Sequence, residues 1–223
     1  MQIQSFTWGD VVFLLGAARY TLALALLTFV AGGALGLFVT FGKLSRSLPV
    51  RLLARAYIEL VQSTPLLMQL FIWFFLLSLF GIDLPATLAA GIALTLNATA
   101  FFAEIWRGSI EAIPNTQWEA AAAIGMSRME QVIHIVAPQA LRIAIAPTVG
   151  LMVQIVKGTS LTALVGFIEL TRAGQLVTST TFQPLTTFGV VGLIYLCICF
   201  PLSMLSQRLE RRLDVSNPLE VGL

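Results

Sequence analysis

Residues 20–42 read YTLALALLTFVAGGALGLFVTFG, a run of 23 residues without one charged side chain. A bilayer core about 30 Å thick requires about 20 apolar residues in a helix, so this run predicts a membrane-spanning helix. Within it, Gly32 and Gly36 have the small-xxx-small spacing that lets two helices pack closely. The whole chain has 223 residues, of which 57% are hydrophobic and 11% are charged, whereas a soluble domain has about 25% charged residues. The chain is therefore predicted to be an integral membrane protein.

Four further intervals of low charge follow along the chain, and with the first they predict an all-α polytopic membrane protein. We expect a single transmembrane domain, residues 1–223, with five spans at 20–42, 60–82, 86–108, 147–168 and 187–207. The polar residues 177–187 are expected to form a loop in front of the fifth span.

The basic side chains near the ends of these spans are distributed unevenly between the two sides of the membrane. One side has only Arg19 and Arg172, and the other has Lys43, Arg46, Arg51, Arg55, Arg107, Arg128, Arg142, Arg208, Arg211 and Arg212. Because Lys and Arg are enriched in cytoplasmic loops, we expect the N-terminus outside and the C-terminus in the cytoplasm. A net charge of +2 gives no reason to expect nucleic acid as a partner.

The connection at residues 111–142 is unusually long and hydrophilic for this chain. Capping boxes at residues 116–119 and 127–130 predict two short helices separated by Gly125, the second ending before Pro138. The loop has three Glu and two Arg, a balance that argues against a DNA-reading helix-turn-helix. Small side chains beside Trp118 favour a unit that docks into another protein, and a merely solvated loop is the alternative.

A spaced pattern lies in this loop: Glu-Ala-Ala at residues 119–121, Gly125, Ile135, and Ala-Pro at residues 137–138. It resembles the EAA loop of bacterial ABC importer permeases, whose pattern has Leu where this chain has Ala137. Further segments match the polar amino acid permeases of type I importers, the histidine/glutamine/glutamate group, from about Tyr20 to Leu213. They are residues 57–60, 63–67, 103–108, 138–142, 157–161 and 209–213. The chain departs from that group at residues 62–65, where Gln-Ser-Thr-Pro stands in place of the common Arg-Gly-Thr-Pro.

The resemblance implies a permease of the type I importer fold that translocates polar amino acids across a bacterial cytoplasmic (inner) membrane by alternating access. It implies three kinds of partner: a dimer of ABC ATPase subunits, a second permease copy or a paralogue, and an extracytoplasmic amino acid binding protein. Coupling to the ATPase is then expected at Trp118, Glu119, Ala120, Ala121, Gly125, Ile135 and Pro138. The sequence has no Gly-x4-Gly-Lys-Ser/Thr phosphate loop. We therefore expect a non-catalytic chain without metal or cofactor, whose partner ATPase uses ATP and Mg²⁺.

Polar side chains inside the predicted spans are candidates for the substrate path. They are Gln62, Thr64, Gln69, Thr95, Asn97, Glu104, Gln154, Lys157, Thr159 and Ser160. An ionisable group inside a span costs about 2.5–3.5 kcal/mol and usually faces a cavity or a partner. Glu104 and Lys157 are therefore expected either to contact substrate or to form a salt bridge with each other.

Several alternatives stay open at this level. An ion-coupled carrier or channel without an ATPase would require ionisable residues at several midplane positions, and only Lys157 is central. The transported amino acid, and whether the two permeases of a complex are identical, are also undecided by the residues.

Overall fold

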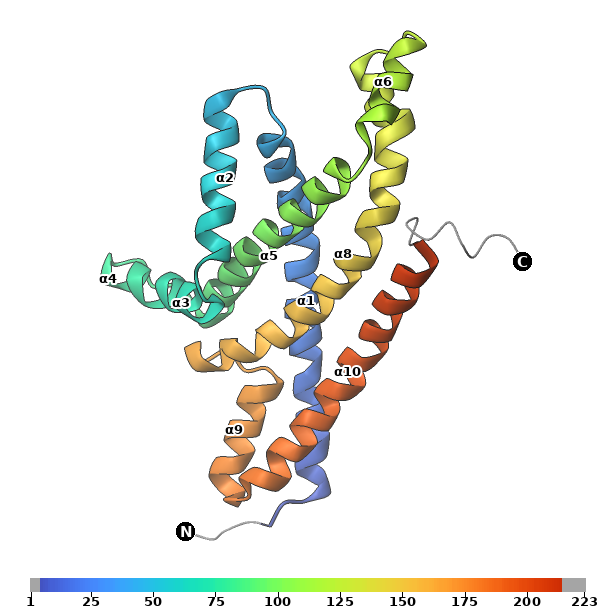
Figure 1. Ribbon diagram of the computed structural model, residues 1–223. Coiled ribbons are helices and arrows are strands. Elements are labelled where there is room, and N and C mark those ends of the chain that lie inside the picture. The colour runs from blue at the N-terminus through green and yellow to red at the C-terminus, as the bar shows by residue number, and fades with distance from the viewer. Residues whose placement is uncertain (1–4, 214–223) are drawn as a thin grey trace, which may run out of the picture.

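The computed structural model describes residues 5–213, and every regular element in that range is helical. The α-helices are α1 (Trp8–Lys43), α2 (Leu48–Gln62), α3 (Leu66–Phe71), α4 (Leu77–Leu79), α5 (Ala86–Glu111), α6 (Asn115–Ala123), α7 (Arg128–Glu130), α8 (Ala137–Thr159), α9 (Leu170–Thr181) and α10 (Pro184–Leu213). Two π-helical segments, Ile72–Leu76 and Gln131–Val136, and a 3₁₀ segment, Ser160–Val165, lie between them. Helix α1 runs along the length of the molecule, with α6 at one end and α9 near the other (Figure 1).

Four helical stretches of the described residues are long and apolar enough to cross a membrane: Trp8–Lys43, Ala86–Glu111, Arg128–Val165 and Pro184–Leu213. A fifth candidate consists of Leu48–Gln62 and Leu66–Leu79, which meet at an angle of 104°. The predicted class, an all-α membrane protein, is confirmed at this level.

Helices α1 and α5 pack closely because α1 has glycine where they meet. A Cβ atom added at Gly36 would lie 2.6 Å from Cβ of Phe102, and one at Gly32 would lie 2.9 Å from Cβ of Ala98. Small residues at such positions let two backbones approach and gain van der Waals contact, which is the main attraction available between helices in lipid. The small-xxx-small spacing therefore serves contact within this chain.

The first helix is longer than the predicted span at residues 20–42. It begins at Trp8, where Thr7 precedes the first turn and its backbone N–H donates to a carboxylate oxygen of Asp10 at 2.8 Å. This capping contact stabilises the first turn of the helix. The hydropathy of the segment alone did not predict that the helix begins here. At about 1.5 Å per residue, the 36 residues of α1 extend beyond a 30 Å hydrocarbon core.

The predicted span at residues 60–82 is not one continuous helix, because the chain bends between α2 and α3. Pro65 has no N–H to continue the helix, and it disfavours helical geometry at the residue before it. The hydroxyl of Thr64 donates to the carbonyl of Leu60 at 3.0 Å, so one of the carbonyls freed at the bend is satisfied.

Residues 177–187 do not form the predicted loop. Helix α9 continues to Thr181, the chain turns at Phe182 with a φ of 53°, and α10 begins at Pro184. The hydroxyls of Ser179 and Thr180 donate to carbonyls three residues earlier in α9, so a polar composition is compatible with helix here. Pro184 suits the first turn of α10, where its missing N–H costs nothing.

Candidate functional site

A cavity of about 240 Å³ lies between α2, α5 and α8. Four of the predicted path residues line it, and they come from three regions of the sequence: Gln62, Thr64, Asn97 and Gln154. The rest of the wall is apolar or glycine: Val61, Leu66, Leu94, Ala98, Phe101, Leu151, Ile155 and Gly158. An apolar wall with a few convergent polar groups is the usual composition of a small-molecule site, so we name this hollow the carboxamide cavity.

Gln69 lies behind the carboxamide cavity and holds two of its polar residues in place. Its side-chain nitrogen donates to the carbonyl of Val61 at 2.8 Å and to the hydroxyl of Thr64 at 2.9 Å. Its side-chain oxygen accepts from the side-chain nitrogen of Asn97 at 3.2 Å. Because Gln69 is buried, these bonds satisfy an amide that would otherwise be costly. The predicted path residue Gln69 is thus a support of the wall.

Three other predicted path residues are not among those that line the carboxamide cavity. The hydroxyls of Thr159 and Ser160 donate to the carbonyls of Val156 and Lys157, at 2.7 and 2.6 Å. Thr95 is buried inside the bundle. Local bonds of this kind are common for Ser and Thr in helices.

Lys157 faces a second hollow, a groove of about 340 Å³ between α8 and α10, which we name the lysine groove. Its other lining residues are Val153, Gly192, Tyr195, Leu196, Cys199, Phe200 and Ser203. Gln154 and Lys157 are three positions apart on α8, which places them about 60° apart around the helix axis. They nevertheless line different hollows, one on each side of this face of α8.

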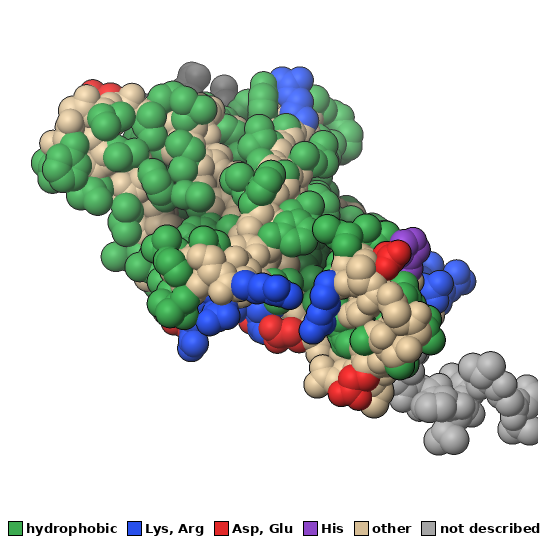
Figure 2. All heavy atoms as spheres, turned by 90° about the horizontal axis from the view of Figure 1, so that it is seen from above, with side chains coloured by type: hydrophobic (Ala, Val, Ile, Leu, Met, Phe, Trp, Pro, Cys, Tyr) green, Lys and Arg blue, Asp and Glu red, His purple; other side chains and the backbone are tan. Residues whose placement is uncertain are grey.

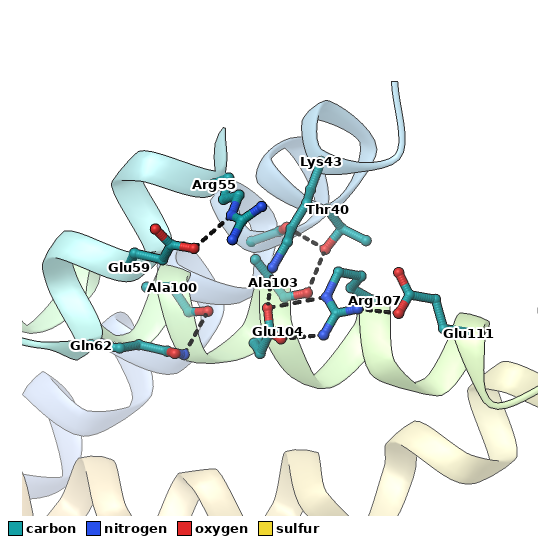
Figure 3. A network of polar contacts seen from close by, with 11 residues as sticks. Thr40, Lys43, Arg55, Glu59, Gln62, Ala100, Ala103, Glu104, Arg107 and Glu111 are labelled. Atoms are coloured by element: carbon teal, nitrogen blue, oxygen red, sulfur yellow. Dashed lines mark hydrogen bonds and ion pairs between the residues drawn. The ribbon is translucent and has the colours of Figure 1, made fainter. Parts of the chain in front are cut away.

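Glu104 is paired with two cations other than Lys157, so the predicted alternative of a Glu104–Lys157 salt bridge is wrong. A carboxylate oxygen of Glu104 lies 2.7 Å from the ammonium nitrogen of Lys43, at the end of α1. The guanidinium of Arg107, one turn further along α5, contacts both Glu104 and Glu111 (Figure 3). The two cations lie near the ends of α1 and α5, and the ion pair of Glu104 with Lys43 ties the two helices together.

A buried carboxylate, Glu169, was missed because it lies outside the predicted spans. It is fully buried at the start of α9, where its side chain accepts from the backbone N–H of Arg172 at 2.9 Å. Its other oxygen accepts from the hydroxyls of Tyr195 at 2.7 Å and Thr21 at 3.3 Å. These donors come from three helices, so Glu169 joins α9 to α1 and α10. The available signal was an acidic residue between apolar neighbours directly before a helix.

The loop at residues 111–142 is folded, with two departures from the prediction. Helix α6 begins at Asn115 after Pro114, so the predicted capping box at residues 116–119 is wrong. The second capping box is confirmed, since the N–H of Ser127 donates to a carboxylate oxygen of Glu130 at 2.7 Å. Gly125 has the predicted left-handed conformation, with a φ of 81°.

The helix after this capping box does not end before Pro138, as had been expected. It continues through the π-helical segment Gln131–Val136 into α8. The wider π turn alters the hydrogen-bond register just where proline cannot donate. The loop is thereby joined to a long membrane-crossing helix without a hinge of irregular chain.

The predicted coupling residues divide between the surface of the loop and its interior. Glu119, Ala120, Gly125 and Pro138 are exposed, whereas Ala121 is buried. Trp118 and Ile135 pack against a small core under the loop, formed by Ile113, Val136 and Ala140. The indole of Trp118 is also covered by Arg128, whose guanidinium carbon lies 5.6 Å from the ring centroid. Trp118 is therefore a support inside the loop.

Two exposed apolar residues of the loop were missed by the sequence analysis. Ile124 is 78% exposed and Met129 is 68% exposed, on either side of Gly125. Large exposed apolar side chains on a folded loop are typical of an interaction surface. Seen from the α6 end, most of the visible charged side chains lie along one side of the molecule, a few lie at the opposite edge, and hydrophobic side chains cover much of the rest (Figure 2).

Comparison with known proteins identifies relatives over most of the chain. The profile of a family described as "Binding-protein-dependent transport system inner membrane component" matches residues 32–215. The chain is 36% identical to the L-cystine transport system permease protein TcyB of Bacillus subtilis (strain 168), over 89% of this chain and 86% of TcyB. It is 32% identical to the glutamine transport system permease protein GlnP of Escherichia coli (strain K12), over 95% of this chain and 97% of GlnP.

A solved structure has the same fold. It is a crystal structure of an amino acid ABC transporter with histidines, and the chain matches it with a TM-score of 0.89 and 30% sequence identity. The match covers 95% of this chain and 100% of that one. Most of the arrangement of helices described above is thus shared with that chain.

Proposed function

The chain belongs to the family of binding-protein-dependent transport system inner membrane components, and on that premise we propose that it is the permease subunit of an ATP-driven importer of polar amino acids. The names of TcyB and GlnP, which are permease proteins for L-cystine and glutamine, support an amino acid as the substrate. The observation that carries the proposal is the family match over residues 32–215, which includes both the loop and the carboxamide cavity.

The loop at residues 111–142 is the proposed contact with the ATPase. Its exposed Glu119, Ala120 and Gly125, flanked by Ile124 and Met129, form a surface with one acidic group and an apolar remainder. A small helix of this kind fits a groove in a partner, where burial of the apolar side chains drives association. Because α8 follows the loop without a break, a shift of the loop is transmitted to the cavity wall at Gln154.

The carboxamide cavity is the proposed section of the translocation path within this chain. Alternating access requires the cavity to open towards each side of the membrane in turn, and α2, α5 and α8 are the helices whose relative movement would do so. The bend at Pro65 gives the α2–α3 wall a point at which it can move.

The remaining parts of the proposal follow from the family and from the charge bias of the sequence. A second permease copy or a paralogue, two ATPase subunits and an extracytoplasmic binding protein complete the complex in a bacterial inner membrane. The α6 end faces the cytoplasm, and ATP and Mg²⁺ are used by the partner ATPase. The chain itself catalyses no reaction.

Reconstitution tests the proposal directly. The permease is expressed with its cognate ATPase, purified, and placed in proteoliposomes with the binding protein, and uptake of radiolabelled amino acids is measured with and without ATP. We expect uptake that requires ATP. Glu119→Lys reverses the charge at the centre of the proposed contact, and it should reduce uptake about 100-fold because the opposed charge is carried into a desolvated interface.

The matched control is Glu210→Lys, the same charge reversal at an exposed position on α10. This variant should copurify with the ATPase and support normal uptake. The proposal fails if the wild-type chain never retains an ATPase, or if Glu119→Lys transports as well as Glu210→Lys. ATP-independent uptake would instead favour the ion-coupled carrier.

A further inference from the structure

The wall of the carboxamide cavity combines hydrogen-bonding groups with a complete lack of charge among its lining residues. Its polar side chains are three carboxamides, Gln62, Asn97 and Gln154, and one hydroxyl, that of Thr64. Each carboxamide offers both an N–H donor and a carbonyl acceptor. A ligand in this cavity therefore meets donors and acceptors and no fixed ion.

Part of this hydrogen-bonding capacity is left free by the protein. Asn97 uses its nitrogen on Gln69, which leaves its side-chain oxygen available. Gln62 makes one long contact, from its nitrogen to the carbonyl of Ala100 at 3.5 Å. Gln154 is exposed and has no hydrogen-bond partner among residues 5–213. The cavity thus has unused donors and acceptors on all three helices.

The charged side chains nearest in sequence on each wall helix are directed elsewhere. On α2, Arg55 and Glu59 pair with each other at 2.6 Å on an exposed surface. On α5, Glu104 is neutralised by Lys43 and Arg107. On α8, Lys157 lines the lysine groove. None of these six groups is among the residues that line the cavity. Glu104, although it is the seventh residue after Asn97, is held in a separate ion network.

We propose that the carboxamide cavity selects amino acids whose side chain carries no net charge. The inference rests on the proposed function, because it names the substrate class of the same path. Charge buried without a counter-ion is costly, whereas polar groups are accepted when they find hydrogen-bond partners. The α-ammonium and α-carboxylate of a zwitterion compensate each other, and carboxamides supply acceptors to one and donors to the other. An extra charge on the side chain has no partner in this wall.

Binding of matched ligand pairs tests the selectivity without a contribution from the binding protein. The permease–ATPase complex is placed in lipid nanodiscs, and equilibrium binding is measured with radiolabelled glutamine and glutamate, and with citrulline and arginine. The members of each pair have similar size and differ in charge. We expect the neutral member of each pair to bind about tenfold more tightly or better.

A charge placed on the cavity wall should change this order. Gln154→Glu introduces a carboxylate of nearly the same shape, and it should make arginine bind more tightly than citrulline. The control Gln207→Glu makes the same change at an exposed residue near the end of α10 and should leave the wild-type order intact. Gln154→Lys should shift preference towards glutamate, which provides a second variant of opposite sign.

The outcomes separate this inference from the function on which it rests. The inference is wrong if the wild-type complex binds the charged member of either pair as tightly as the neutral member, or more tightly. It is also wrong if the wild-type complex binds none of the four amino acids. A Gln154→Glu complex that assembles but keeps the wild-type order also overturns it. A complex that binds neutral ligands and shows no ATP-dependent uptake would contradict the proposed function and leave the selectivity of the cavity established.

Discussion

The carboxamide cavity and the lysine groove are adjacent hollows that share α8 and differ in their chemistry. The cavity is lined by three helices that bring Gln62, Asn97 and Gln154 together without a charged side chain. The groove lies between α8 and α10, and Lys157 and Tyr195 are among the residues that line it. Lys157 is the most conspicuous charged residue inside a predicted span. It therefore lies in the hollow that has fewer polar side chains.

The difference shows what an ionisable residue in a membrane helix indicates. An ionisable side chain inside a membrane is costly, so it usually faces a cavity or a partner. This cost does not indicate which of two hollows is the transport path. Convergence of uncharged polar residues from several helices is the stronger sign of a path, because each of these side chains offers hydrogen-bonding groups that need a partner.

The largest effect is expected when each hollow is filled in turn. Gln154→Trp fills the carboxamide cavity, and Ser203→Trp fills the lysine groove with the same side chain. Uptake by reconstituted complexes should fall about 100-fold for the first variant and by about twofold or less for the second, since on the proposed function only the cavity admits an amino acid. Equal losses in complexes that assemble normally would remove the distinction.

A smaller effect is expected when the support of each wall is removed. Gln69→Leu leaves the side-chain nitrogen of Asn97 without its acceptor and removes the closer of two donors to the carbonyl of Val61. A buried polar group left unpaired costs about 1–3 kcal/mol. Tyr195→Phe removes a donor to Glu169 behind the groove. Both variants should lower the melting temperature of the purified complex. Only Gln69→Leu should also raise the apparent KM for uptake, because it frees the cavity residue Asn97; a raised KM in Tyr195→Phe would count against the contrast.

The smallest effect is expected from the most conspicuous residue. Lys157→Met keeps an unbranched side chain that is one atom shorter and removes the charge, and it should change uptake by about twofold or less because the ammonium group is not part of the cavity wall. The preference between glutamine and glutamate should stay the same. A loss of uptake comparable to that of Gln154→Trp, in a complex that still contains the ATPase, would place the path along the groove instead.

The membrane class and the permease family were predictable because both depend on local sequence. Apolar runs identify membrane helices from composition alone, and the spaced pattern from Glu119 to Pro138 lies within one loop. The resemblance on which the family rests is confirmed by the profile match over residues 32–215. The left-handed Gly125 and the capping box at Ser127 were predictable for the same reason, since each needs only its sequence neighbours.

The features that the sequence analysis did not predict depend on contacts between distant segments. The partners of Glu104 come from α1 and from its own helix, and spacing along the chain does not rank them above Lys157. Glu169 is buried only because Thr21 and Tyr195 approach it from other helices. Whether a polar residue of α8 faces the cavity or the groove is decided by where α5 and α10 lie, and hydropathy contains no information on that.

The measurement that tests the central claim most directly is an electron cryo-microscopy structure of the permease–ATPase complex bound to its tightest neutral amino acid. The ligand is expected between α2, α5 and α8, with its polar groups against the side chains of Gln62, Asn97 and Gln154. Ligand density in the groove beside Lys157, with the carboxamide cavity empty, would contradict the claim.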